Sequence, residues 1–150
     1  MGDDVEFFER LNGAKSVSSF LDALKWDEDG RVVVVSQDHR SKEVLGVAFA
    51  NREALELTFK TGLMHYYSRS RKKLWKKGEE SGHFQRLVDL RVDCDGDALV
   101  ARVRQVKGNC HLGYFSCFAS RFTKGQGGAL RMKLVGKKVF DPRKAYGKKR

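Results

Sequence analysis

The sequence predicts a small α+β domain in which β-hairpins predominate and one or two helices accompany them. Three observations lead to this fold class. Arg31–Ser36 is a run of β-branched residues, Phe84–Asp93 alternates between apolar and polar residues, and Asn51–Gly62 has helical spacing. A chain of 150 residues suffices for one domain with a hydrophobic core. No apolar run approaches the roughly 20 residues of a membrane span.

In the first half of the chain, a predicted hairpin lies between two predicted helices. Ser16–Leu24 is expected to form a short helix with a serine N-cap. Arg31–Ser36 is predicted as a buried strand and Val44–Ala50 as its partner, joined by a polar turn at Asp38–Lys42. The helix of Asn51–Gly62 would begin at an asparagine cap and end at a glycine.

A second hairpin is predicted further along the chain. Leu63–Ser68 is expected to be a strand, and Arg69–His83, rich in basic residues and glycine, a loop. Phe84–Asp93 and Ala98–Val106 would pair through the tight-turn dipeptide Asp95-Gly96.

Basic charge is concentrated at the C-terminus. Residues 121–150 contain eleven Lys or Arg and one acid, whereas the first 120 residues hold 19 basic and 18 acidic side chains. We therefore expect a domain over residues 1–124 and a basic extension over residues 125–150, which begins with a flexible joint at Gly125–Gly128. A solvated tail is the simplest interpretation. An arm that contacts RNA or steers an anionic substrate is the alternative.

Three aspartates alternate around the tip of the second hairpin. Asp93, Asp95 and Asp97 superficially open an EF-hand loop, but Ala98 and Arg104 stand where that loop requires glycine and glutamate. Turn chemistry explains Asp95 without a metal. Three like charges in a tight turn repel one another, and a hard divalent cation would relieve that repulsion. Partly hydrated magnesium fits such a site better than caged calcium.

The three cysteines permit two interpretations. Cys94, Cys110 and Cys117 are an odd number in a chain whose first residues lack the features of a secretory signal, so we expect reduced thiols and a cytoplasmic location. No CxxC pair is present. The cysteines are either small apolar residues of a reduced core or a three-thiolate zinc site with an open fourth position. Such a site activates water, and His111 would be placed to shuttle the proton.

The basic loop of Arg69–His83 has the composition of an anion-binding surface. Arginine offers bidentate contacts to phosphate, lysine offers a point charge, and glycine permits close backbone approach. Trp75 is suited to stacking on a base. A solvated basic loop has the same composition, and single-stranded RNA is a further possible ligand. No RNP1, KH or C2H2 signature accompanies it, so binding of nucleic acid is not favoured.

Several of these segments together resemble phosphoribosyl-AMP cyclohydrolase, the enzyme of the third step of histidine biosynthesis. They occur in the family's order and cover roughly residues 26–118. The ending Val139–Pro142 is a less specific match. The matching segments are Asn51–Leu55, His65–Arg71, Leu74–Glu79, Ser81–His83, Arg91–Asp97, Cys110-His111, Gly113-Tyr114 and Ser116–Phe118.

The resemblance implies a zinc-dependent hydrolase that opens the adenine ring of phosphoribosyl-AMP at the N1–C6 bond, with magnesium in support. It makes Cys94, Cys110 and Cys117 zinc ligands and the three aspartates magnesium ligands. It also implies an intertwined homodimer in which the zinc site takes cysteines from both subunits. Proton transfer falls to His111. The substrate-binding residues would be Arg69, Ser70, Arg71, Trp75, Lys76, Lys77, Gly78, Glu79, Ser81, Gly82 and His83.

Three positions depart from the family pattern. Glu80 and Leu112 stand where the family usually has threonine, and Phe115 often corresponds to arginine. Each change removes a polar or basic group near the substrate, so it bears on substrate affinity more than on metal binding. Two other hypotheses stay open: a basic RNA-associated protein, and a degenerate family member whose zinc is only structural.

Overall fold

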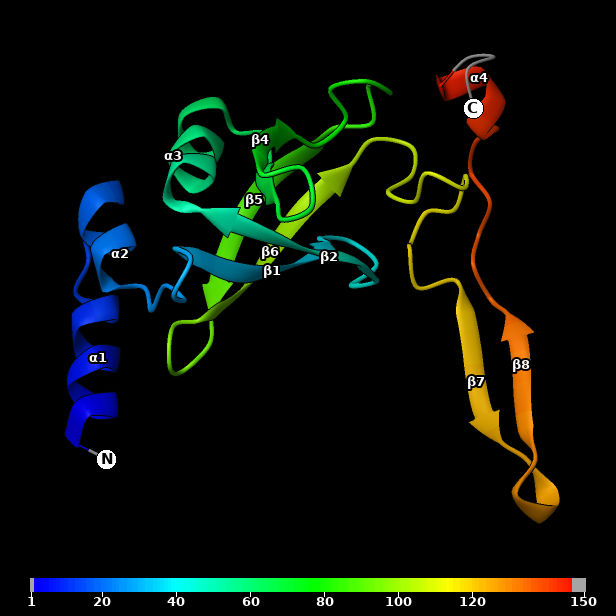
Figure 1. Cartoon of the computed structure of the whole chain (residues 1–150), viewed down its shortest axis with the longest axis horizontal. Helices are drawn as coiled ribbons and strands as arrows, with labels where there is room; N and C mark the ends of the chain where they lie inside the picture. Colours follow the sequence, from blue (N-terminus) through cyan, green and yellow to red (C-terminus); the bar gives the residue numbers. More distant parts are fainter. Residues whose placement is uncertain (1, 147–150) are drawn as a thin grey trace.

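The structure, a computed structural model, describes residues 2–146 of the chain (Figure 1). Its elements are, in chain order, α1 (Gly2–Asn12), α2 (Val17–Ala23), β1 (Arg31–Asp38), β2 (Val44–Asn51), α3 (Arg52–Thr61), β3 (His65–Ser68), β4 (Lys73–Lys76), β5 (Gln85–Val92), β6 (Ala98–Gln105), β7 (Ser120–Lys124), a 3-10 turn (Gln126–Gly128), β8 (Leu130–Leu134) and α4 (Pro142–Tyr146). The α+β class is confirmed. The described residues contain four α-helices, however, rather than one or two.

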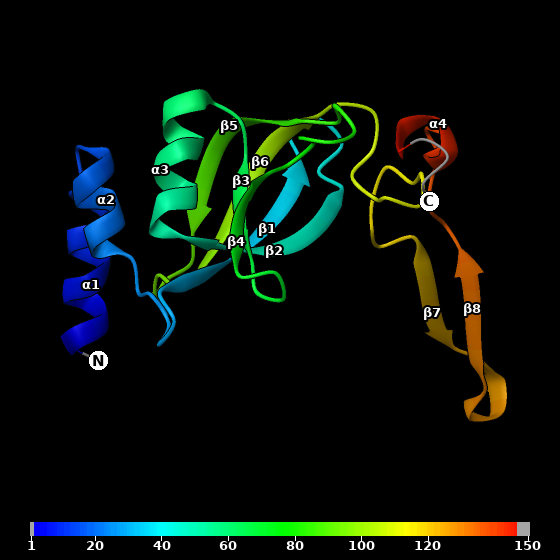
Figure 2. The ribbon, with the colours of Figure 1, turned by 45° about the horizontal axis from the view of Figure 1, so that its top comes forward.

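Six strands form one mixed sheet in the order β4-β3-β2-β1-β6-β5. The predicted hairpins β1–β2 and β5–β6 are both present and antiparallel. Between them, β1 pairs in parallel with β6, from Val33 opposite Ala98 to Asp38 opposite Val103. This long-range pairing joins the two hairpins into a single sheet, so the segments before and after the basic loop share one core (Figure 2).

The core consists mainly of aliphatic side chains from the sheet and from α2 and α3. The largest fully buried hydrophobic side chains are Leu21, Val32, Val34, Leu45, Leu55, Met64, Leu99 and Val103. Strand β1 alternates strictly between buried and half-buried residues, as the β-branched run predicts. Helix α2 packs against α3 through the rings of Phe20 and Phe59, whose centroids lie 5.6 Å apart.

The two predicted helices have the predicted ends. The Oγ of Ser16 accepts a hydrogen bond from the N–H of Ser19 at 3.0 Å and caps α2. The Oδ1 of Asn51 accepts one from the N–H of Ala54 at 2.9 Å and caps α3. Gly62 ends α3 with φ of 76°, a left-handed conformation that glycine adopts without strain.

The prediction of a continuous loop at Arg69–His83 is wrong at its centre. Residues 73–76 form β4, which pairs with β3 so that Trp75 lies opposite Tyr66. The sequence conceals this strand because lysines surround its two apolar residues. Leu74 and Trp75 nevertheless pack against the core, and this contact holds the segment at the edge of the sheet.

The last two strands, β7 and β8, form a separate hairpin, here called the arm, that extends away from the six-stranded sheet (Figures 1 and 2). The segment predicted as a flexible joint lies at its turn, so the predicted boundary between residues 124 and 125 falls within the arm. Pairing places Phe122 opposite Met132 and Arg121 opposite Lys133. Because residues alternate along a strand, one face of the arm is mainly apolar and the other is basic.

The N-terminal helix α1 was not among the predicted elements. It lies beside α2, at the opposite end of the molecule from the arm (Figure 1). None of the helices in residues 2–146 has the length and apolar character that crossing a membrane requires.

Candidate functional site

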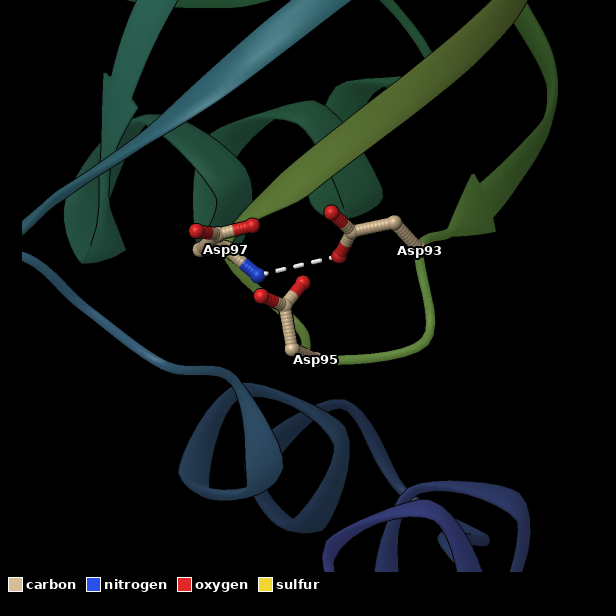
Figure 3. Close-up of side chains that lie close together, drawn as sticks. All are labelled: Asp93, Asp95 and Asp97. Atoms are coloured by element: carbon tan, nitrogen blue, oxygen red, sulfur yellow. Dashed lines mark hydrogen bonds between the residues drawn. The ribbon is translucent and has the colours of Figure 1, made fainter. Parts of the chain in front are cut away.

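The three aspartates converge at the tip of the β5–β6 hairpin (Figure 3). Asp93, Asp95 and Asp97 each offer a carboxylate oxygen within 4.8 Å of the others. Within the described part of the chain, no other set of three or more His, Cys, Asp or Glu side chains is this close. The Oδ1 of Asp93 accepts hydrogen bonds from the N–H of Asp97 at 3.1 Å and of Ala98 at 3.3 Å. The turn thus fixes the spacing of the carboxylates.

The crowding of these carboxylates shifts their protonation. The hydrogen bond with Asp93, together with partial burial and the charge of Asp95, raises the pKa of Asp97 to about 6. Burial acts to raise the pKa of Asp93 as well, but hydrogen bonds from Asp97 and the Ala98 backbone outweigh it and lower this pKa. A cluster of hard oxygen donors that resists full ionisation is suited to a hard divalent cation, so these residues fit magnesium.

Gly96 holds this turn against the N-terminal helix. Its φ is 77°, and a Cβ at this position would come within 2.0 Å of the Phe7 ring of α1. Its carbonyl also accepts a hydrogen bond from the N–H of Lys25 at 2.9 Å. Only glycine combines a positive φ with the absence of a Cβ, so position 96 requires glycine. The Asp-Gly signal in the sequence therefore identifies the turn, but not the helix that packs on it.

The cysteines lie at two separate places. Cys110 and Cys117 are together in the loop that follows β6, whereas Cys94 is exposed in the turn that precedes β6. An eight-residue strand is roughly 23 Å long, so it keeps Cys94 well away from the other two. The three sulfurs predicted as one zinc site do not meet within a single chain.

The pair formed by Cys110 and Cys117 is close enough for the thiols to influence each other. Cys117 is partly open to solvent, but the protein atoms around its sulfur raise the pKa of this thiol to about 11, and the charge of Cys110 adds to this rise. Lys77 and a hydrogen bond from Asn109 act in the opposite direction. Two thiols in one small loop fit zinc, which favours soft sulfur ligands.

His111 is presented to solvent by a tight turn beside Cys110. The N–H of Cys110 donates to the carbonyl of Tyr114, and the N–H of Gly113 donates to the carbonyl of Cys110, both at 3.0 Å. Gly113 has φ of 100°, and a Cβ there would lie 2.5 Å from the carbonyl oxygen of Phe140. The turn leaves the imidazole of His111 exposed next to a buried sulfur.

A pocket of about 760 Å³ opens on β3, β4 and the turn after β4. It brings together nine of the eleven predicted substrate-binding residues, namely Arg69, Ser70, Arg71, Trp75, Lys76, Lys77, Gly78, Glu79 and Ser81. Gly82 and His83 are not part of its lining. The lining residues that were not predicted are Ala48, Phe49, Tyr67, Ser68, Lys73, Glu80 and Tyr146. Ala48, Phe49 and Tyr67 lie outside the basic segments, so composition gave no signal for them.

Aromatic rings hold the cationic wall of this pocket in place. The guanidinium carbon of Arg69 lies 3.9 Å from the centroid of the Phe49 ring, a cation–π contact. Trp75 rests on Tyr66, with centroids 5.3 Å apart. The Oγ of Ser68 accepts a hydrogen bond from the N–H of Arg71 at 3.2 Å. The pocket therefore presents positioned cations beside a flat aromatic surface.

His83 packs against the Gly78 turn at the edge of the pocket. It is buried, and its ring centroid lies 4.4 Å from that of Phe140. Burial lowers the pKa of His83, and the charges of Lys107 and Lys77 add to the effect. The turn above it requires glycine at position 78, where φ is 84° and a Cβ would meet the backbone of His83 at 2.6 Å.

Lys77 connects this pocket to the cysteine pair. It lines the pocket, and its Nζ donates a hydrogen bond to the carbonyl of Asn109 at 2.8 Å, one residue before Cys110. Burial lowers the pKa of Lys77, although the nearby thiols Cys117 and Cys110 raise it in part. Lys77 therefore links the wall of the pocket to the loop that carries both cysteines.

Comparison with known proteins identifies the family of this chain. The sequence profile described as phosphoribosyl-AMP cyclohydrolase matches residues 46–119. A phosphoribosyl-AMP cyclohydrolase of Methanosarcina acetivorans is 52% identical to the chain over 126 residues, which is 84% of this chain and 98% of that protein. The chain belongs to the phosphoribosyl-AMP cyclohydrolase family. The resemblance inferred from the sequence motifs is confirmed.

Other phosphoribosyl-AMP cyclohydrolases show the same extent of similarity. The protein of Chromobacterium violaceum is 52% identical over 130 residues, covering 86% of this chain and 95% of its own. That of Methanothermobacter thermautotrophicus is 53% identical over 116 residues, covering 77% and 82%. The match to the phosphoribosyl-AMP cyclohydrolase profile includes the aspartates, the cysteines and the basic segment of the pocket, and it ends just before the arm.

Proposed function

We propose that the protein hydrolyses the N1–C6 bond of the adenine ring of phosphoribosyl-AMP, the third step of histidine biosynthesis. The observation that carries this proposal is the hydrogen bond from Lys77 to Asn109, because it joins a cationic pocket to a pair of thiols. Hydrolysis of a phosphorylated nucleotide at a thiolate-bound zinc would need both parts side by side. We also propose a cytoplasmic location, where the thiols stay reduced.

The pocket accounts for substrate binding. Arg69, Arg71 and Lys76 would bind the two phosphates, since guanidinium and ammonium groups pair with phosphate oxygens. Trp75 would stack on the purine, with its ring already supported by Tyr66. The basic charge of the pocket would also draw the anionic nucleotide toward it.

The chain's own residues would hold two metals. Cys110 and Cys117 of one copy and Cys94 of a second copy would bind zinc, and the three aspartates would bind magnesium. When bound, zinc supplies a Lewis acid that activates water at neutral pH. His111, exposed beside Cys110, would accept and return the proton. Asn109 and Lys77 would keep the cysteine loop next to the substrate.

The separation of the cysteines and the exposed arm both support a homodimer. The apolar side chains on one face of the arm are exposed, with 58% of Phe122 and 71% of Leu130 accessible to solvent. An isolated two-stranded hairpin is at best marginally stable in water. We propose that this face packs on a second copy of the chain, which in turn brings its Cys94 to the thiol pair.

The test is ring-opening activity and zinc content measured on the same purified protein. We expect activity that strong chelators abolish. Cys110→Ala should lose zinc and turnover together, because only two of the three sulfurs would remain at each site. Ser116→Ala is the matched control, since Ser116 is buried beside Cys117 but is not a proposed ligand. Full turnover by Cys110→Ala would contradict the proposal, and zinc without turnover in the native protein would favour a structural metal.

A further inference from the structure

We propose that Asn109 is a positioning residue that donates a hydrogen bond to the sulfur of Cys117 and so stabilises it as a thiolate ligand. The inference rests on the proposed function, because it takes Cys117 as a zinc ligand. The Nδ2 of Asn109 lies 3.2 Å from the Sγ of Cys117 and 2.8 Å from the carbonyl oxygen of Leu45. Both hydrogens of this amide therefore have an acceptor.

A chain of three side-chain amides, two of them buried, fixes which end of Asn109 faces the sulfur. Gln105 donates through Nε2 to the carbonyls of His83 at 3.2 Å and Val106 at 3.1 Å. Backbone carbonyls can only accept, so the Oε1 of Gln105 is left as an acceptor. It accepts a hydrogen bond from the Nε2 of Gln85 at 2.9 Å. The orientation of Gln105 thus determines that of Gln85.

The hydrogen bonds of Gln85 in turn determine the orientation of the Asn109 amide. The Nε2 of Gln85 also donates to the Oδ1 of Asn109 at 3.1 Å, while its Oε1 accepts from the hydroxyl of Tyr66 at 2.5 Å. Gln85 is completely buried, and Asn109 is 8% exposed. The Oδ1 of Asn109 must therefore accept, and its Nδ2 must point at Leu45 and Cys117. Reversing any one amide would place donor against donor.

Gly46 provides the space for this contact. A Cβ at position 46 would lie 2.6 Å from the Nδ2 of Asn109 and 3.8 Å from the Sγ of Cys117. A distance of 2.6 Å is shorter than any ordinary contact, so a side chain here would displace the amide. Strand β2 thus leaves room for the Asn109 amide beside Cys117, because position 46 has no side chain.

The chemical effect follows from the charge on sulfur. An N–H donor beside a thiolate spreads its negative charge and offsets the loss of water around it. Partners that hold metal ligands in this way typically change metal affinity by about 10- to 100-fold when they are removed. Asn109 would also restrain the direction of the sulfur lone pairs, since its own position is fixed by Gln85 and Lys77.

The decisive experiment compares Asn109→Asp with Ser116→Ala in the full-length protein. Aspartate has nearly the same shape and keeps Oδ1, but it replaces the donor with an oxygen. We expect zinc affinity, measured by competition with a chelator, to fall about 10- to 100-fold in N109D. In cobalt-substituted N109D, the thiolate-to-cobalt charge-transfer band should move to lower energy. Ser116→Ala removes the hydrogen bond donated to the carbonyl of Val44 and the one accepted from the N–H of Phe118. Neither bond involves a sulfur, so this variant should change neither measurement.

The inference would be overturned if N109D had the same zinc affinity and the same cobalt spectrum as the native protein. If N109D does not fold, Gly46→Ala decides, because it displaces the same amide without adding charge. Native affinity and spectrum in folded Gly46→Ala would overturn the inference in the same way. Absence of zinc binding by the native protein would instead contradict the proposed function.

Discussion

Cys94 and Cys110 stand at opposite ends of β6, Cys94 in the turn before the strand and Cys110 in the loop after it. Extended chain cannot fold back over this distance, so one copy of the protein cannot unite these two thiols. A zinc site with all three thiols would therefore need two chains, and each chain would contribute to two sites. This geometry makes the shared site testable by mixing variants.

Cys94→Ala and Cys110→Ala should each be inactive, yet activity should return when the two variants are unfolded and refolded together. Half of the dimers would be mixed, and one of their two sites would have all three cysteines, so we expect about a quarter of native activity. Mixing Cys110→Ala with Cys117→Ala is the control. These two residues come from the same loop, so that mixture should stay inactive. No recovery in the first mixture would rule out a shared site.

Replacing Phe122 and Met132 by serine should separate the dimer. These side chains lie opposite each other on the apolar face of the arm. Each would lose about 1.5–3 kcal/mol of burial, so the double variant should dissociate at concentrations at least about 100-fold higher. Sedimentation measures the change. Arg121→Ser with Lys133→Ser, the cross-strand pair on the other face, should leave the dimer intact; dissociation of both double variants would point away from the apolar face.

Magnesium should stabilise the protein more at pH 8 than at pH 5. The pKa of Asp97 is raised to about 6, so between its ordinary value and 6 the folded protein binds more protons than the unfolded chain. Without metal, stability should therefore fall as pH rises through this range, and magnesium should offset the loss once Asp97 is ionised. Thermal unfolding with and without magnesium at both pH values tests this. Asp97→Asn should abolish the difference, and an equal magnesium effect at pH 5 and pH 8 in the native protein would contradict the assignment.

Arg69→Lys should weaken substrate binding while it leaves the turnover number nearly unchanged. Lysine loses both the bidentate contact with phosphate and the planar stacking on Phe49. Hydrogen bonds to charged groups contribute about 1.5–3 kcal/mol, so we expect KM to rise about 10- to 100-fold. Steady-state kinetics provide the measurement. Arg40→Lys, in the β1–β2 turn outside the pocket, should behave as the native protein does; a fall in turnover without a change in KM would exclude a binding role for Arg69.

Local signals in the sequence identified much of the fold. The caps at Ser16 and Asn51 and the glycine at position 62 define helix ends, and their effects act over a few residues only. The tight turn at Asp95-Gly96 correctly joined two strands. The parallel pairing of β1 with β6 depends on contacts between distant segments, and no local pattern reports such contacts.

Residues of the candidate site were predicted where several reactive or charged side chains follow one another in the sequence. Residues that distant segments bring to the site were missed. Arg69 and Trp75 were recognised from the composition of their segment, but Phe49 comes from another strand and has no distinctive neighbours. Asn109 has no distinctive signal in the sequence, because its role depends on its contacts with Gln85 and Cys117. The strands of the arm were not predicted, because basic residues alternate with the apolar ones. The high positive charge of this segment was more evident than its strand-like alternation.

The position of β6 between β1 and β5 has a consequence for synthesis on the ribosome. When β1 and β2 have emerged, the second edge of β1 is still unpaired, because its neighbour is made only after the whole pocket segment. Nascent chains with an open strand edge are prone to aggregation. Strand β6 can pair with β1 only once Gln105 has left the exit tunnel. Translation pauses before that point would therefore prolong the time during which the edge of β1 is exposed.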